Sequence, residues 1–131
     1  MAVQKFRVWH KPMQRMGEVL AISFERQKVK IRHLRGTTHM TVPFDDVELM
    51  QSTGLFDNST PKKEIFEGDI VETIYNEKLF TGVTVYDKKE TDFKATNGRN
   101  EYGNNFCYLG GNDSIIVIGD IYRNPELVEV K

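Results

Sequence analysis

The stretch EIFEGDIV, residues 64–71, follows the most turn-prone segment of the chain, DNSTP at residues 57–61. Asp, Asn, Ser and Pro favour turns, either through side-chain hydrogen bonds to the main chain or through a fixed φ angle. Within the stretch, Gly68 permits a backbone geometry that other residues disfavour, and Asp69 is able to hydrogen-bond nearby main chain. The residues that follow, Ile70 and Val71, are apolar and β-branched. We therefore interpret the stretch as the start of a buried strand and not as a binding site.

Short β-prone runs continue downstream of this stretch, with polar connections between them. Strands are predicted at residues 69–75, 79–86, 91–95, 106–109 and 114–118. Short strands with turns at such regular spacing favour a small barrel over a layered α/β fold. After the last strand, Asn124 is a capping residue and Pro125 suits the first helical position, which predicts one helical turn.

The first half of the chain also has the pattern of strands. Residues 28–32, KVKIR, alternate with period two, so Val29 and Ile31 are expected to face inward while three cations line the other face. Residues 47–51 fit either a strand or a single helical turn, because periodicity does not separate the two over so few residues. The remaining strands of this half are predicted at residues 5–9, 18–24 and 39–42. The whole pattern indicates an all-β fold with N-terminal hairpins and at most one or two short helical turns.

Length and composition are those of one folded domain. The chain has 131 residues, of which 39% are hydrophobic, and this is enough to form a core. A lone cysteine forms no internal disulfide, and no apolar run is long enough to span a membrane, so we expect a cytoplasmic protein. The core is predicted to contain Val29, Ile31, Ile65, Phe66, Ile70, Val71, Val83, Val85, Phe93, Ile116 and Ile118.

Four segments resemble those of a known family. They are KFRVW at residues 5–9, LMQSTGL at 49–55, EIFEGDIV at 64–71 and VIGDIYRNPEL at 117–127. In this order they are similar to the YopX family of small bacteriophage and prophage proteins. The resemblance implies an SH3-like β-barrel core and a phage accessory role, without specifying its biochemistry.

The resemblance also suggests an organisation for the chain. It predicts a single YopX-like domain over residues 1–131, with a basic N-terminal hairpin region at 1–56 and an SH3-like barrel region at 64–131. Between them, residues 57–63 differ from the compact turn that is usual in the family. We expect this segment to be a lengthened connector loop in which sequence variation is tolerated.

The residues that most often perform catalysis show no arrangement that predicts an enzyme. His33 and His39 are placed to meet across a hairpin, but two histidines do not complete a metal site. The glycine pair Gly110-Gly111 fits a hairpin turn better than a phosphate loop, and Cys107 has no neighbouring base in the sequence. We therefore expect a non-enzymatic role with no metal and no cofactor, and an enzyme without a recognisable motif is the third alternative, after the two binding functions below.

Charge is distributed unevenly along the chain. Residues 1–35 contain nine basic and two acidic residues, a net of +7, whereas the whole chain has a net charge of −1. This asymmetry fits either attraction between the two halves or a surface that binds a polyanion. The candidate nucleic-acid-binding residues are Lys5, Arg7, Trp9, Lys28, Lys30 and Arg32.

Two classes of binding function stay open from the sequence. The first is a protein-interaction or self-assembling module, in which the strand at residues 28–32 is an open sheet edge that adds a strand from another chain. The second is a nucleic-acid-binding regulator, in which the basic strands follow a phosphate backbone and Trp9 stacks on a base. The residues of the turns, Gly68, Asp69, Asn124 and Pro125, are assigned structural roles in either case.

Overall fold

The computed structural model describes residues 5–75, 77–97, 106–112 and 114–128. These residues form antiparallel sheets and two short 3₁₀ helices, which confirms the predicted all-β class. The chain divides into two compact units, residues 1–52 and residues 53–131. The boundary falls inside strand β5, which runs from Val47 to Phe56. Residues 47–51 therefore form part of a strand and not a helical turn.

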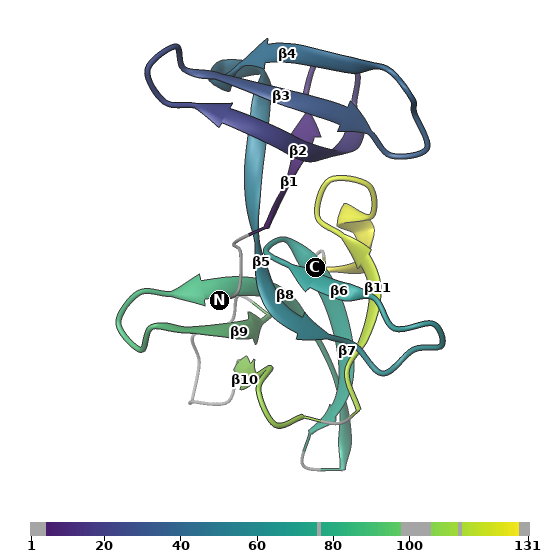
Figure 1. Ribbon diagram of the computed structural model, residues 1–131. Coiled ribbons are helices and arrows are strands. Elements are labelled where there is room, and N and C mark those ends of the chain that lie inside the picture. Colours follow the sequence, from purple (N-terminus) through teal and green to yellow (C-terminus); the bar gives the residue numbers. More distant parts are fainter. Residues whose placement is uncertain (1–4, 76, 98–105, 113, 129–131) are drawn as a thin grey trace. The chain divides into compact units, whose positions relative to one another are not determined.

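The N-terminal unit contains five strands of a six-stranded antiparallel sheet, in the order β4-β3-β2-β1-β5 (Figure 1). The sixth strand, β6 (Glu64–Phe66), follows β5 in the sheet. The 3₁₀ helix η1, Phe44–Asp46, connects the fourth strand to the fifth. The first four strands are β1 (Phe6–His10), β2 (Arg15–Ser23), β3 (Lys28–His33) and β4 (His39–Pro43).

The core of this unit lies on one face of the sheet. Val29 and Ile31 of β3 are fully buried, as their alternation with Lys28 and Lys30 predicts. Val8 and Val47 pack in the same cluster from the neighbouring strands β1 and β5. Because side chains alternate along a strand, the cations of β3 lie on the opposite, outer face.

The C-terminal unit contains the end of β5, which pairs with β6, and a second antiparallel sheet of order β10-β9-β8-β7-β11. In both units four consecutive strands form a meander and the fifth returns beside the first. The barrel closure expected for the SH3-like region stays a prediction. The strands of this unit are β6 (Glu64–Phe66), β7 (Asp69–Tyr75), β8 (Lys78–Asp87), β9 (Asp92–Thr96), β10 (Phe106–Tyr108) and β11 (Ile116–Asp120).

The predicted core of the C-terminal unit is correct only in part. Ile65, Ile70 and Val71 are buried, but the other predicted members are only half-buried: Phe66, Val83, Val85, Phe93, Ile116 and Ile118. In β8 the buried positions are Phe80, Gly82 and Thr84, so Val83 and Val85, which alternate with them, face the other way. The core cluster instead contains Phe80, Ala95, Cys107, Leu109 and Ile115 in addition to Ile65 and Val71.

Close packing at Gly82 accounts for this register. A Cβ atom at Gly82 would lie 3.0 Å from both the main-chain nitrogen and the carbonyl oxygen of Thr96. Only glycine therefore fits at this inward position of β8. A prediction that places the most apolar residues in the core chooses Val83 and Val85, because it does not consider the close contact at Gly82.

The turn before β7 has the geometry that the sequence predicts. Gly68 has a φ of 85°, in the left-handed region, and Asp69 Oδ2 accepts a hydrogen bond from the Phe66 nitrogen at 2.8 Å. The main chain of Gly68 donates to the Thr84 carbonyl at 2.9 Å and accepts from the Ile121 nitrogen at 3.0 Å. This turn thus holds β7 against two other segments of the unit.

The last helical turn differs in one detail from the prediction. Helix η2, Pro125–Leu127, begins at the predicted proline, but the Asn124 side chain makes no capping hydrogen bond. Asn124 Oδ1 instead accepts a hydrogen bond from the Asp120 nitrogen at 3.2 Å, at the end of β11. The role of Asn124 is therefore to tie the turn to the strand before it.

The connector loop is built around one fully buried carboxylate, that of Asp57. Its Oδ1 accepts hydrogen bonds from the Ser59 nitrogen, the Ser59 hydroxyl and the Lys63 nitrogen, and its Oδ2 accepts one from the Val117 nitrogen. The Asn58 nitrogen also donates to the Ile115 carbonyl. These contacts link the loop to β11 and argue against tolerance at Asp57, and tolerance elsewhere in the loop stays a prediction.

Candidate functional site

Most of the predicted cationic residues lie on the outer face of the N-terminal sheet. Lys28 and Lys30 of β3 are exposed, and Arg32 follows them on the same face with a half-buried side chain. β1 contributes Arg7 and Trp9 to this face. Arg7 lies opposite Glu18 of β2, and Glu18 lies opposite Arg32 of β3, so the three share a face. Trp9 is two residues after Arg7 and therefore faces the same way. We call this surface the cationic face and define it by Arg7, Trp9, Lys28, Lys30 and Arg32.

Two acidic residues share the cationic face: Glu48 of β5 lies opposite Trp9, and Glu18 of β2 lies in the row of Arg7 and Arg32. Glu18 of β2 stands between Arg7 and Arg32 in the same row of the sheet, and the Arg32 guanidinium forms an ion pair with the Glu18 carboxylate. Two arginines therefore flank a single carboxylate. The lysines of β3 lie away from this row, opposite Ala21 and Ser23 of β2.

Trp9 and Lys5, two of the predicted nucleic-acid-binding residues, differ in their exposure. Trp9 is half-buried and lies opposite the buried Met16 on β2 and opposite Glu48 on β5. Part of its ring surface is thus already covered by protein. Lys5 precedes β1 and is exposed, and its carbonyl accepts a hydrogen bond from the Ser52 nitrogen at 2.9 Å.

The open edge of the N-terminal sheet is β4, not β3. β3 pairs with β2 on one side and with β4 on the other, so the prediction that residues 28–32 form an edge is wrong. Within the described residues β4 pairs with β3 alone. The sequence could not show which of several similar strands ends the sheet.

Two histidines meet inside the N-terminal unit, but they are not the predicted pair. His10 Nδ1 lies 3.0 Å from His33 Nε2, and both residues are buried, whereas His39 is exposed and lies opposite Arg32. Burial lowers the pKa of His33, and the positive charge of Arg15 and the nearby His10 lower it further. The described part of the chain contains no group of three or more residues suited to hold a metal ion.

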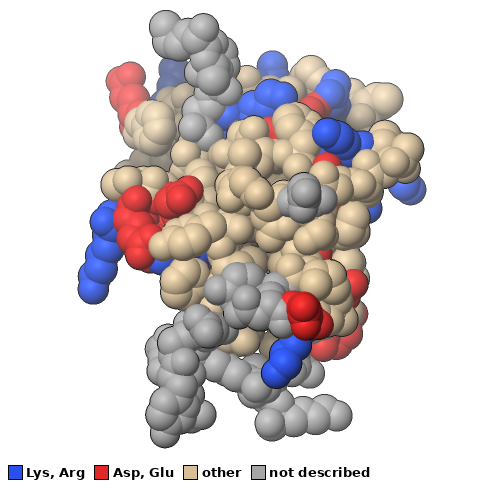
Figure 2. Space-filling model, turned by 90° about the horizontal axis from the view of Figure 1, so that it is seen from below, with Lys and Arg blue, Asp and Glu red and all other residues tan. Residues whose placement is uncertain are grey.

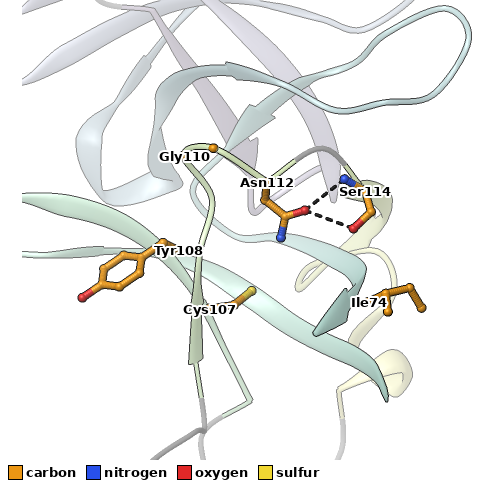
Figure 3. Close-up of a pocket in the computed structure, with 7 residues that line it drawn as sticks. Ile74, Cys107, Tyr108, Gly110, Asn112 and Ser114 are labelled. Carbon is orange, nitrogen blue, oxygen red and sulfur yellow. Dashed lines mark hydrogen bonds between the residues drawn. The ribbon is translucent and has the colours of Figure 1, made fainter. Parts of the chain in front are cut away.

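The C-terminal unit has a shallow, open depression of about 340 Å³. It is lined by Ile74, Cys107, Tyr108, Gly110, Gly111, Asn112 and Ser114. Cys107 and Tyr108 are adjacent in β10 and point in opposite directions (Figure 3). Asn112 Oδ1 accepts hydrogen bonds from the nitrogen and the hydroxyl of Ser114, so these polar groups bond to each other. Burial raises the pKa of the Cys107 thiol, which disfavours the nucleophilic thiolate.

A charged and aromatic cluster holds β10 in place beside this depression. Lys94 Nζ lies 2.8 Å from Asp87 Oδ2 and 3.1 Å from Glu90 Oε1, and it sits 4.2 Å from the centre of the Phe106 ring. The Tyr108 hydroxyl donates to Glu90 Oε2 at 2.5 Å. The hydrogen bond and charge of Asp87 raise the pKa of Lys94. This cluster was not predicted, and its one signal in the sequence is the pairing of strands across the turn at residues 88–91.

The fold and these surfaces define a small all-β protein with a cationic sheet face. The sequence matches the YopX protein family over residues 5–129, and the chain therefore belongs to that family. Its structure is similar to the crystal structure of protein EF1440 from Enterococcus faecalis, with 25% sequence identity and a TM-score of 0.58. That match covers 98% of this chain and 100% of the other. No curated protein matches the sequence.

Proposed function

We propose that this chain is a non-catalytic binding module that recognises an acidic protein surface through its cationic face. The observation that carries the proposal is the arrangement of Lys28 and Lys30, which are exposed and alternate on one face of β3. Complementary charge increases the rate and the specificity of association. No acidic residue precedes or follows them within β3 or on β4.

A second copy of the chain is the first partner to consider. Residues 1–52 contain nine basic and five acidic residues, a net of +4, whereas residues 53–131 have nine basic and fourteen acidic residues, a net of −5. The basic unit of one copy is thus complementary in charge to the acidic unit of another. Figure 2 shows that acidic and basic groups both occur on the face seen from below, with broad areas of other residues between them.

The chemistry of the depression supports the non-catalytic part of the proposal. Its thiol, Cys107, is buried and has a raised pKa. Its amide and hydroxyl groups, those of Asn112 and Ser114, bond to each other and to the Thr73 hydroxyl. Groups that act as acids, bases or nucleophiles need a pKa matched to the reaction, but burial raises the pKa of Cys107 and the hydrogen bond to Glu90 raises the pKa of Tyr108.

Nucleic-acid binding is the second candidate. The spacing of Lys28 and Lys30 along an extended strand favours it, since phosphate groups also repeat along a backbone. Two features favour a protein partner instead. Glu18 places a carboxylate within the cationic face, and Trp9 is half-buried and so presents less ring surface for a base to stack on.

Anisotropy titrations compare the two candidates directly. A labelled acidic polypeptide and a single-stranded DNA of equal charge are titrated with the protein from about 50 to about 500 mM salt, a range over which screening increases strongly. The proposal predicts tighter binding of the polypeptide at every salt concentration. Equal or tighter binding of DNA would overturn it in favour of the second candidate. Light scattering at the two salt limits tests self-association, with a dimer expected only at low salt.

The biological setting is also part of the proposal. We place this protein in the bacterial cytoplasm as a phage or prophage accessory factor, a setting supported by membership of the YopX family and by the YopX-like motifs. The described residues include no helix that is long and apolar enough to cross a membrane. Genomic neighbourhood tests the setting, because phage genes with related functions lie together.

A further inference from the structure

We propose that β4 accepts an extended acidic segment of the partner as an additional strand of the N-terminal sheet. The inference rests on the proposed function and specifies its mode of recognition. β4, His39–Pro43, ends the sheet in the described part of the chain, and Figure 1 shows it at the margin of its unit. An exposed strand edge is a template for a peptide, whose main-chain groups supply affinity.

The register shows which main-chain groups point outward. The Phe44 nitrogen donates to the Gln27 carbonyl at 2.9 Å, so these two directly opposite residues are a hydrogen-bonded pair. Bonded and non-bonded pairs alternate in an antiparallel ladder. The pairs Lys28 with Pro43, Lys30 with Thr41 and Arg32 with His39 are therefore non-bonded.

The outward groups of β4 follow from this alternation. His39 and Thr41 each direct an N–H and a carbonyl away from β3, and Pro43 directs a carbonyl alone because it has no N–H. All three residues are exposed. Met40 and Val42, between them, use their main-chain groups to bind β3. The edge thus offers two donors and three acceptors to an incoming strand.

The side chains next to this edge select acidic residues. His39 and Thr41 lie on the same face as Lys30 and Arg32, because cross-strand partners share a face. Neighbouring strands are about 4.8 Å apart, so an added strand lies about 10 Å from β3, a span that lysine and glutamate side chains bridge together. On the other face, the added residues approach the half-buried Met40.

These two faces define the chemistry of the ligand. The partner segment has Asp or Glu at alternate positions, facing Lys30 and Arg32, with apolar β-branched residues between them. Asp45 and Asp46 of η1 follow the strand, so acidic residues of the partner are disfavoured at the Pro43 end. The segment therefore pairs chiefly with His39 and Thr41.

Backbone-methylated peptides test strand addition in the full-length protein. The probe is a fluorescent hexapeptide of alternating Glu and Val, and two versions are N-methylated, one at the Glu residues and one at the Val residues. Only one set of N–H groups faces β4, so one version is expected to bind about tenfold more weakly than the parent while the other stays within about threefold. Equal effects of the two patterns would overturn strand addition.

The same experiment separates this inference from the proposed function. If the parent peptide binds and both methylated versions bind alike, the cationic face acts without strand addition, and only the inference fails. If the parent peptide does not bind at about 50 mM salt, the proposed recognition of acidic partners fails as well.

Variants of Thr41 provide an independent test. Thr41→Pro removes an outward N–H that β3 does not use, and Thr41→Val keeps that N–H as the matched control. The proline variant is expected to bind the parent peptide at least about fivefold more weakly, and the valine variant to bind it within about twofold. Circular dichroism verifies the fold of each variant. If the Thr41→Pro variant folds and binds the parent peptide as tightly as the wild type does, the inference is contradicted. If that variant does not fold, the methylated peptides alone test strand addition.

Discussion

His10 Nδ1 and His33 Nε2 lie 3.0 Å apart inside the N-terminal unit, although β2 runs between the strands that carry them. His33 lies opposite Gly17 of β2, and Gly17 lies opposite Val8 of β1. A Cβ atom at Gly17 would lie 2.9 Å from the Arg32 carbonyl oxygen and 3.5 Å from the His33 Cα, so the middle strand closely approaches the main chain of β3 beside the two rings. The rings stack with centroids 5.1 Å apart.

The histidine pair predicts that the N-terminal unit loses stability in mild acid. The folded state lowers the pKa of His33 below its ordinary value of 6.5, so the unfolded chain binds more protons below that pH. Stability is therefore fully present above about pH 6.5 and falls as the pH decreases through the folded pKa. Urea unfolding between about pH 5 and pH 8 measures this, and His33→Gln is expected to flatten the profile. The exposed His39→Gln variant is the control, and an equal effect of both variants would refute this role for the pair.

Gly17→Ala tests the close approach of β2 to the main chain of β3 beside the histidine pair. A Cβ atom at Gly17 would lie 2.9 Å from the Arg32 carbonyl oxygen, which belongs to the main chain of β3 and cannot move alone. We expect a loss of about 1–3 kcal/mol in the free energy of unfolding, and altered ring resonances of both histidines in NMR spectra. Gly110→Ala, at a position with open space around it, is the control. Normal stability of Gly17→Ala would show that β2 and β3 have room to adjust.

Gly68→Val tests the turn that begins β7. Valine disfavours the left-handed φ of 85°, and we expect a loss of about 2 kcal/mol or more, seen as a lower thermal midpoint. Asp69→Asn keeps an acceptor oxygen for the Phe66 nitrogen, so its effect is expected to be smaller and to leave peptide binding unchanged. Loss of binding in Asp69→Asn without loss of stability would indicate a ligand site and not a turn.

Asp57→Ala tests the connector loop. Burial alone raises the pKa of Asp57, but hydrogen bonds from the Ser59 hydroxyl and from the Val117, Lys63 and Ser59 nitrogens outweigh it and hold the pKa below 3.8. Removing the carboxylate leaves those donors without their acceptor, with an expected loss of about 3 kcal/mol in urea unfolding. The exposed Lys62→Ala variant is the matched control, and comparable stability of the two would refute the structural role of Asp57.

The same carboxylate gives a pH dependence of its own. Because its folded pKa lies below its unfolded value, the stability it contributes is present above about pH 4 and is lost as the pH falls further. The pH range in which Asp57 affects stability lies below the range in which His33 does. One series of unfolding measurements across pH therefore separates the two effects. Asp57→Asn is expected to weaken the acid dependence while keeping part of the hydrogen bonding.

Local patterns in the sequence predicted local structure well. The alternation around Val29 and Ile31 identified the buried face of β3, and Gly68 with Asp69 identified the turn. Each of these features depends on residues within a few positions of one another. The all-β class follows from the sum of such signals, which the structure confirms.

Features that depend on distant packing were not predictable in the same way. The inward register of β8 depends on the contact of Gly82 with Thr96, and the histidine pair depends on the pairing of β2 with both β1 and β3. The open edge at β4 depends on the complete strand order. The cationic residues were identified from the sequence, but the carboxylate of Glu18 among them was not, because only the sheet places it in their row.

A sign-inversion experiment tests the central claim of recognition through the cationic face. The double variant Lys28→Glu, Lys30→Glu reverses the charge of β3 at two exposed positions that lie away from the core. Two peptides of alternating sequence, Glu-Val and Lys-Val, are titrated with the wild-type protein and with the variant. If the cationic face recognises acidic partners, the wild type is expected to bind the acidic peptide about tenfold or more tightly than the basic one, and the variant is expected to prefer the basic peptide. An unchanged preference for the acidic peptide in a folded variant would contradict this expectation.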